Sequence, residues 1–271
     1  MVSDSNLKFQ TMSLIVNLGI TQKNPVEILV IYYASEAPAS TDFVELIHGT
    51  RVMLKGLNSL VSLDYKIIES FQYEELVGQF GVPKNSHITK TAYLRYFLDV
   101  FVDKRTKKVL YLDIDVLVKR DIGELFELEF DEVIAASLAS PDSMAMGEHL
   151  PNFSGEYFNS GVLVIDMNKW RDKQISRELA RVTQGEIFPF LDQDALNLVF
   201  QNNWKKINRR YNWFHDVTKR QIDLIDWPEP SIIHFVGLKP WYICDETEYV
   251  IEYRVLFERI RILSKSLQNR V

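Results

Sequence analysis

The 271-residue chain has one cysteine, Cys244, and few residues that break regular structure, with 11 glycines and 9 prolines. A single cysteine excludes an internal disulfide framework and is typical of a protein from a reducing compartment. No uncharged apolar run approaches the roughly 20 residues that a membrane-spanning helix needs. Aromatic residues make up 12% of the chain, which excludes a disordered or fibrous protein.

The charge balance is mildly acidic, with 31 Lys and Arg against 37 Asp and Glu and a net charge of -6. This balance argues against nucleic acid as a partner. The first residues, from Met1 to Asp4, lack the basic region and apolar stretch of a secretory signal. We therefore expect a cytoplasmic enzyme or binding protein, large enough to bury a substantial core.

Apolar runs alternate with amphipathic segments, which predicts an α/β protein. Strands are expected at Val26–Tyr33, Leu63–Ile68, Lys108–Asp113, Val133–Leu138, Gly161–Asp166 and Ser231–Val236. The first three are nearly continuous in apolar residues, which is typical of buried parallel strands. Helices are expected at Lys8–Thr21, Thr41–Leu57, Lys90–Val100, Met167–Gln184, Asp192–Gln201 and Tyr249–Leu267.

Several familiar sites are missing from the sequence. It contains no G-x-G-x-x-G, no G-x-x-x-x-G-K and no G-x-S-x-G, and no Cys/His cluster has zinc spacing. A dinucleotide fingerprint, a P-loop and a nucleophile elbow are therefore all excluded. Any phosphate-bearing ligand must be held in another way.

The sharpest chemical motif is Asp113 and Asp115 at the end of an apolar strand. Residues two apart on a strand point to the same side, and the carboxyl ends of strands face the ligand crevice of an α/β sheet. Two carboxylates there suit Mg²⁺ or Mn²⁺. The alternative interpretation is a strand that runs into a polar turn.

A second motif, Ile232 to Trp241, places His234 on a strand, followed by Gly237 and Lys239. The imidazole accepts Mn²⁺ beside carboxylates, the glycine lets backbone approach a ligand, and the lysine suits phosphate. The alternative is a core histidine beside a turn.

Three further segments carry polar residues at organised positions. Thr91 and Arg95 are four residues apart and are expected to share a helix face, so Arg95 either binds a phosphate or sugar oxygen or pairs with a structural carboxylate. Asn159 stands just before an expected strand. Asp192, followed by Gln193, is expected to cap a helix.

Six motifs in order resemble glycosyltransferase family 8, the retaining family that includes glycogenin and bacterial lipopolysaccharide galactosyl- and glucosyltransferases. They are V-S-D-S-N at the start, H-x(5)-Y-x-R, L-D-x-D, F-N-S-G-V-L, D-Q-D-A-L-N and H-F-x-G-x-K-P-W. The resemblance covers nearly the whole chain. It implies a GT-A fold, a single Rossmann-like domain with a mixed central sheet, that binds a UDP-sugar with Mn²⁺ or Mg²⁺.

The resemblance also implies residue roles. Nucleotide contacts fall on Asp4, Asn6, Ile114, Gly237 and Lys239; metal ligands are Asp113, Asp115 and His234; the donor sugar meets Arg95, Asn159, Asp192 and Gln193; His87 lies on the diphosphate or acceptor side. The implied reaction moves a hexose, of the galactose or glucose class, to a saccharide or other hydroxyl acceptor. With Gln193 and Asp192 as the catalytic pair, we expect front-face attack, in which the leaving phosphate takes the acceptor proton.

Three departures from the family pattern leave another function open. Leu7 replaces an aromatic residue, and only Leu238 separates Gly237 from Lys239, where two residues are usual. The Asp that often follows the strand ending near Ala139 is also missing, and the next one is Asp142. The alternative is a nucleotide-sugar-binding protein with weakened catalysis. The sequence leaves the oligomeric state open.

Two further segments lie outside the motifs. Residues 1–248 are predicted to form the catalytic domain, and 249–271 an amphipathic helix packed on it, with weak or absent membrane association. The stretch Ser140–Gly155 is either an acceptor or lid loop or an irregular connection.

Overall fold

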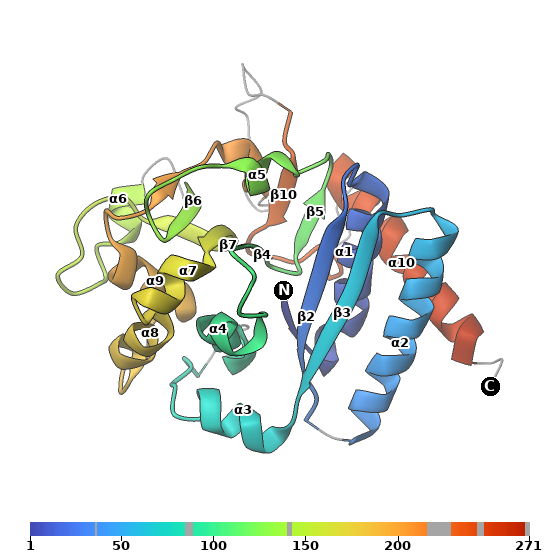
Figure 1. Cartoon of the computed structure of the whole chain (residues 1–271), viewed down its shortest axis with the longest axis horizontal. Helices are drawn as coiled ribbons and strands as arrows, with labels where there is room; N and C mark the ends of the chain where they lie inside the picture. Colours follow the sequence, from blue (N-terminus) through green and yellow to red (C-terminus); the bar gives the residue numbers. More distant parts are fainter. Residues whose placement is uncertain (36, 85–88, 140–142, 216–228, 243–246, 269–271) are drawn as a thin grey trace.

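A computed structural model describes residues 1–35, 37–84, 89–139, 143–215, 229–242 and 247–268. Strands and helices alternate through most of the chain, as the sequence predicts. The hydrogen-bonded strands form three sheets (Figure 1). Within the described ranges, no helix combines the length and the apolar character needed to cross a bilayer.

The first sheet is parallel and has the order β1-β2-β3. Its strands are β1 (Val2–Asp4), β2 (Val26–Tyr33) and β3 (Val61–Ile68). Two long helices connect them, α1 (Lys8–Thr21) and α2 (Ala37–Gly56). The short helices η1 (Ser5–Leu7) and α3 (Ser70–Val77) lie at the ends of β1 and β3.

The second sheet has the order β5-β10-β9 and is mixed. β10 (Ile232–Phe235) is antiparallel to β5 (Val116–Val118) and parallel to β9 (Trp213–His215). The third sheet, β4-β7-β6-β8, contains β4 (Lys108–Leu112), β7 (Phe158–Asp166), β6 (Ile134–Leu138) and β8 (Lys205–Lys206). The long central strand β7 is antiparallel to both β4 and β6.

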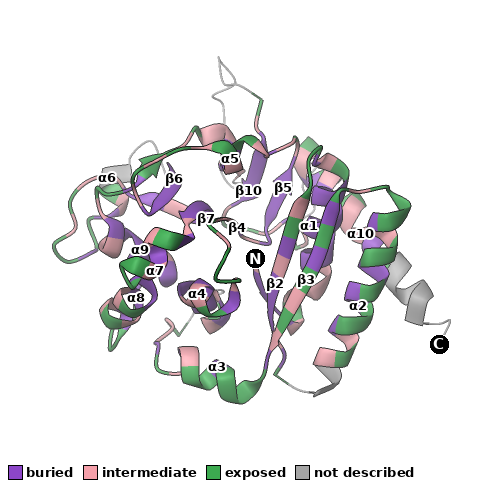
Figure 2. Ribbon diagram, viewed as in Figure 1, coloured by how far each residue is buried: buried purple, intermediate pink, exposed green. Residues whose placement is uncertain are grey.

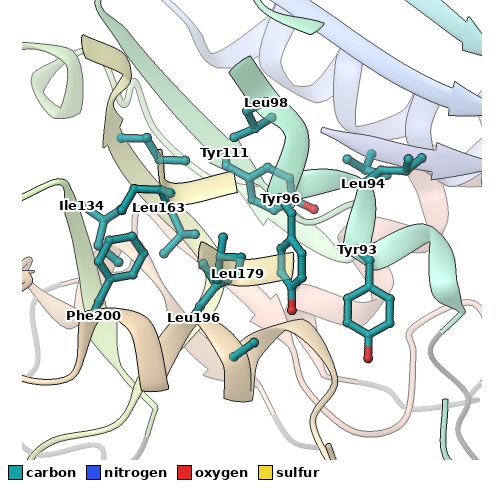
Figure 3. Packing of buried hydrophobic residues seen from close by; sticks show 14 of the residues in the cluster. Tyr93, Leu94, Tyr96, Leu98, Tyr111, Ile134, Leu163, Leu179, Leu196 and Phe200 are labelled. Atoms are coloured by element: carbon teal, nitrogen blue, oxygen red, sulfur yellow. The ribbon is translucent and has the colours of Figure 1, made fainter. Parts of the chain in front are cut away.

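The remaining helices cover the third sheet or join the sheets. They are η2 (Lys90–Phe97), α4 (Leu98–Phe101), α5 (Glu124–Glu127), α6 (Ser143–Met146), α7 (Met167–Asp172), α8 (Ile175–Thr183), α9 (Asp192–Phe200) and η3 (Arg209–Tyr211). The last helix, α10 (Glu248–Gln268), instead packs on α1 and the second sheet. One apolar cluster, partly drawn in Figure 3, joins η2 to β4, β6, β7 and helices α7 to α9. A second joins α1 and α2 to β2, β3 and β5. Figure 2 shows the buried residues between these layers.

Three details differ from the predicted elements. β4 is antiparallel to its neighbour β7, whereas a parallel strand was predicted. The prediction failed because a run of apolar residues indicates burial on both faces and carries no information on strand direction. β3 alternates between buried and exposed residues, as an edge strand does, and is not buried on both faces. The expected helix Lys90–Val100 is mostly a 3-10 helix, η2, followed by one short α-helical turn.

Two more boundaries were also misplaced. The expected helix Met167–Gln184 divides into α7 and α8, since Gln174 adopts a left-handed backbone at φ 51° between them. β7 begins at Phe158, three residues before the expected strand. Helix α10 packs against α1 and buries Val250 and Tyr253; its separation from residues 1–248 as a second unit stays a prediction.

Candidate active site

Asp113 and Asp115 lie in the turn between β4 and β5. β4 ends one residue before Asp113 and β5 begins one residue after Asp115. The two carboxylates therefore lie in a polar turn, and the prediction that strand periodicity aligns them was wrong. The turn is anchored on both sides: the Asp113 N–H donates to the Gly161 carbonyl at 2.8 Å, and the Asp115 carbonyl accepts from Phe235 N–H at 3.0 Å. These bonds hold both carboxylates at the junction of the second and third sheets.

His234 comes from β10 and completes a cluster of three ligand groups. Asp113, Asp115 and His234 each offer one ligand atom, and these atoms all lie within 4.8 Å of one another. The imidazole Nε2 is 3.4 Å from Oδ1 of Asp115, whereas Nδ1 is 2.9 Å from Oδ1 of Asn212. Two carboxylates and an imidazole nitrogen form a donor set that fits Mn²⁺ or Mg²⁺. The residues present therefore fit the implied cation.

Arg95 on η2 connects this cluster to a second carboxylate. Its Nη2 is 2.7 Å from Oδ1 of Asp113, and its Nε is 2.9 Å from Oδ2 of Asp192. Nη1 donates to the Ser160 carbonyl at 3.0 Å. The guanidinium also lies 4.3 Å from the ring centre of Tyr111, whose hydroxyl donates to Asp113 at 3.0 Å. Arg95 is thus buried and bridges two carboxylates; a direct sugar contact stays a prediction.

The prediction that Thr91 and Arg95 share a helix face was wrong. In a 3-10 helix, residues three apart align, so residues four apart diverge. The Thr91 hydroxyl instead donates to Oδ2 of Asp4 at 3.4 Å. The other oxygen of Asp4 accepts from the N–H of Asn6 at 3.0 Å and caps η1. η2 therefore joins the start of the chain to the cluster of Asp113, Asp115 and His234.

α9 begins at Asp192, so this residue is the first of the helix and not its cap. The cap position is Leu191, which has φ 46° and no capping side-chain bond. Burial raises the pKa of Asp192 to about 7, although the charge of Arg95 acts in the opposite direction. Asp192 is therefore shielded from solvent and lies beside the positively charged guanidinium of Arg95.

Gln193 and Asn159 contact each other directly. Asn159 is the second residue of β7, inside the strand and not before it. Its Nδ2 donates to Oε1 of Gln193 at 2.9 Å, and the N–H of Ser160 donates to the same oxygen at 3.0 Å. The structure thus brings these two predicted sugar-site residues together next to Asp192.

Lys239 lies beside Asp115. Its Nζ is 2.5 Å from Oδ2 of Asp115 and donates to the Phe235 carbonyl at 2.9 Å. Burial acts to raise the pKa of Asp115, but the charge of Lys239, with the His234 imidazole beside it, outweighs burial and holds that pKa well below its usual range. Gly237, two residues before Lys239, has φ 74°, a conformation that glycine adopts readily.

The other predicted residues have more separate positions. Ile114 is buried in the turn between the two aspartates, and Asn6 is exposed on η1. His87 lies outside the described residues, as do residues 140–142 of the expected lid segment. Within the described part of that segment, 143–146 form the short helix α6. Their assigned contacts with ligands stay predictions.

Several residues in contact with the site were not predicted from the sequence. Tyr111 and Ser160 support Arg95, and Asn212 contacts His234. Tyr111 lies two residues before Asp113 on an apolar strand, where it reads as a core residue. Asn212 lies between η3 and β9, elements too short to leave a periodic pattern.

A family model described as glycosyl transferase family 8 matches residues 16–243. This chain belongs to that family. General stress protein A of Bacillus subtilis is 30% identical over 213 residues, which cover 71% of this chain and 71% of that protein. Glycosyltransferase GlyB of Streptococcus pneumoniae is 25% identical over 237 residues, covering 78% of this chain and 55% of GlyB. The chain therefore spans little more than half of GlyB.

Two further proteins are similar to this chain, one in sequence and one in fold. The lipopolysaccharide 1,2-glucosyltransferase of Escherichia coli is 28% identical over 178 residues, covering 60% of this chain and 52% of that enzyme. The galactosyltransferase LgtC, solved with donor and acceptor sugar analogs, superposes with a TM-score of 0.73 at 21% identity over 96% of both chains. This family 8 chain is a glycosyltransferase with the expected GT-A fold.

Proposed function

We propose that this chain transfers a hexose from a UDP-sugar, of the galactose or glucose class, to a saccharide or other hydroxyl acceptor. The reaction depends on Mn²⁺ or Mg²⁺ and retains the anomeric configuration. The observation that supports it is the position of the Asp113, Asp115 and His234 cluster, which Arg95 connects to Asp192. Family membership supports the same chemistry, and LgtC and the E. coli enzyme are named for galactosyl and glucosyl transfer.

The cation would be held by Asp113, Asp115 and His234. When bound, it would stabilise the charge that develops on the departing diphosphate. Lys239 supplies a further positive charge beside Asp115, and we assign it, with Gly237, to the diphosphate oxygens. Asp4, Asn6 and Ile114 are assigned to the nucleoside. No proton donor is needed at the leaving group, because the positive charges of the cation and Lys239 would stabilise the departing diphosphate.

The contacts of Gln193 and Asp192 support front-face attack. Oε1 of Gln193 already accepts two hydrogen bonds, from Asn159 and Ser160, so both of its lone pairs are occupied. The Asp192 carboxylate is paired with buried Arg95. Neither group is therefore placed as a free nucleophile.

The step balances without an enzyme nucleophile. The bond between the anomeric carbon and the diphosphate oxygen breaks, and the acceptor oxygen bonds to the same face of that carbon. The acceptor proton moves to the departing phosphate oxygen. In this scheme Gln193 and Asp192, with Arg95 and Asn159, bind and orient the donor sugar.

The testing experiment measures UDP release from UDP-galactose and UDP-glucose with Mn²⁺, with and without saccharide acceptors, followed by NMR of the product anomer. We expect metal-dependent release and a retained configuration. Donor binding without any release would instead support the weakened binding protein. Mass spectrometry that traps a glycosyl adduct on Asp192 would overturn front-face attack.

A further inference from the structure

Asn212 belongs to none of the sequence motifs, yet its side chain is fully buried against the metal ligand His234. We propose that Asn212 is a positioning residue: it presents His234 to the cation through Nε2 and couples the cation site to Gln193. The part of this inference that concerns the cation rests on the proposed function. The part that concerns the imidazole tautomer stands on the hydrogen bonds alone.

The orientation of each amide follows from a backbone donor. The N–H of Gly161 can only donate, so the Asn159 atom 2.9 Å from it is the acceptor Oδ1. The Asn212 atom 2.8 Å from that same oxygen must then be the donor Nδ2. Oδ1 of Asn212 consequently faces Nδ1 of His234 at 2.9 Å. A neutral imidazole that donates from Nδ1 keeps its lone pair on Nε2, the nitrogen that lies toward Asp115.

A backbone donor also fixes the orientation of Gln193 at the other end of the network. The N–H of Ser160 identifies the Gln193 atom beside it as Oε1, which also accepts from Nδ2 of Asn159. Nε2 of Gln193 therefore points to the Tyr157 hydroxyl at 3.2 Å, and that hydroxyl donates to Oδ1 of Asp194 at 2.5 Å.

All the hydrogen bonds of this network are donated in the same direction. Donation passes from His234 to Asn212, Asn159 and Gln193, and then through Tyr157 to the fully buried Asp194. Hydrogen bonds aligned in this way polarise one another. A metal-bound histidine that donates its other N–H to an acceptor has a fixed ring orientation and is a more basic ligand. The network therefore joins the metal ligand to the sugar-site glutamine.

The bonding of Asn212 differs from that of an asparagine that only supports the fold. Its two side-chain bonds go to the side chains of His234 and Asn159. Asn17 is also buried, but its amide bonds the N–H and the carbonyl of Val118 and so fixes backbone. Asn17 is consequently the matched control, a buried asparagine with two hydrogen bonds remote from this network.

The first measurement is ¹⁵N NMR of the histidine nitrogens in the cation-free protein, with the His234 signals identified by their loss in His234→Gln. We expect protonated Nδ1 in the wild type. In Asn212→Ala, most of the population should carry the proton on Nε2, where Asp115 can accept it. Asn17→Ala should retain the wild-type tautomer even if its melting temperature falls.

The second measurement is Mn²⁺ affinity by titration calorimetry. We expect Asn212→Ala to bind Mn²⁺ roughly 10- to 100-fold more weakly, the usual cost of losing a partner of a metal-bound histidine. Asn212→Asp keeps an acceptor for Nδ1 but places an oxygen against Oδ1 of Asn159. Its Mn²⁺ affinity should stay within about threefold of the wild type, whereas kcat for UDP-sugar turnover falls about tenfold or more, because Gln193 loses its orientation.

The outcomes separate this inference from the proposed function. A wild-type His234 protonated on Nε2, or folded Asn212→Ala with an unchanged tautomer, would overturn the role of Asn212. A changed tautomer with an unchanged Mn²⁺ affinity would overturn its role toward the cation. If the wild type binds no Mn²⁺ while the tautomer depends on Asn212, the proposed metal dependence fails and the positioning of His234 by Asn212 is upheld.

Discussion

Gly161 lies so close to His234 that a β-carbon on it would stand 2.3 Å from Cε1 of the imidazole. The same β-carbon would stand 3.0 Å from Oδ2 of Asp113. Glycine weakens the interior of a strand, and β7 is the central strand of its sheet. The space that a side chain would occupy here is taken by His234 and Asp113, two of the three proposed metal ligands, which explains why β7 has a glycine at this position.

Gly161→Ala should therefore displace His234 and weaken Mn²⁺ binding by about tenfold or more, the scale seen when a ligand loses its supporting geometry. Titration calorimetry measures this directly. Gly56→Ala is the control, because a β-carbon there meets no atom within 4 Å, and its affinity should be unchanged. Equal Mn²⁺ affinities for the two variants would contradict the placement of the cation.

Asp113→Asn and Asp115→Asn should each abolish most metal-dependent turnover. Each substitution keeps the size of the side chain but weakens the pairing with Arg95 or Lys239, so the folding of each variant is checked first. We expect a loss of about 10²-fold or more in kcat, by analogy with removal of one preorganised charge-stabilising group. Circular dichroism confirms folding. A folded variant with normal Mn²⁺-dependent turnover would show that its carboxylate is not a ligand.

Arg95→Ala should reduce both activity and stability. It leaves Asp192, which is almost fully buried, without its positive partner. Breaking a buried ion pair costs about 3–5 kcal/mol of unfolding free energy, which urea denaturation measures. The exposed pair of Arg181 and Glu178 gives the comparison, since Arg181→Ala should cost less than about 1 kcal/mol. Similar small losses in both variants would mean that Arg95 does not hold the two carboxylates together.

Patterns that depend on local sequence were sufficient for much of the fold. The bounds of α1 and β2 match the predicted ones, because the apolar positions of α1 and the continuous apolar run of β2 are clear local signals. The direction of β4 was not predictable, since it depends on which strand lies beside it. The 3-10 conformation of η2 was not predicted either, and η2 makes long-range bonds, such as that of Arg95 to Asp113, which periodicity does not reveal.

The site shows the same division between local and long-range information. The motifs identified Asp113, Asp115 and His234, which the structure brings together although more than a hundred residues separate His234 from the aspartates. The two-residue spacing predicted that strand geometry aligns the aspartates, but they lie in a turn. Asn212 was missed because its importance comes only from contacts with His234 and Asn159, which are distant in sequence.

The stability of the protein should depend on pH through Asp192. Its pKa is raised from 3.8 to about 7, mainly by burial, so the folded state holds this proton more tightly than the unfolded state. The resulting stabilisation is complete below about pH 4 and is lost as the pH rises through about 7. Asp192→Asn cannot ionise and should not show this loss.

The measurement is the melting temperature of Asp192→Asn minus that of the wild type, from pH 5 to 8 in metal-free buffer. We expect this difference to become more positive as the pH rises. Subtraction removes the contribution of groups that titrate in both proteins. A difference that stays constant across the range would mean that Asp192 is already ionised at pH 5.

The C-terminal helix α10 is expected to support the fold and not to anchor the enzyme on a membrane. Its buried residues Val250 and Tyr253 pack with Ile233 and Phe235 of β10, the strand that carries His234. Tyr253→Ala should lower the unfolding free energy by about 3–5 kcal/mol, the usual cost of deleting a buried aromatic side chain. Val255→Ala on the exposed face should change it little.

Deletion of 249–271 should therefore destabilise the enzyme, and the intact chain should bind anionic liposomes little at physiological salt. The residues from Glu248 onward have only a small excess of basic over acidic groups, and each effective basic residue near anionic lipid contributes about 1 kcal/mol. Co-sedimentation of the intact protein with liposomes measures binding, and thermal unfolding of the shortened protein measures stability. A helix that packs against β10 cannot be removed without loss of stability. Strong liposome binding that disappears with the deletion, together with an unchanged melting temperature, would therefore show that α10 binds the membrane and does not support the fold.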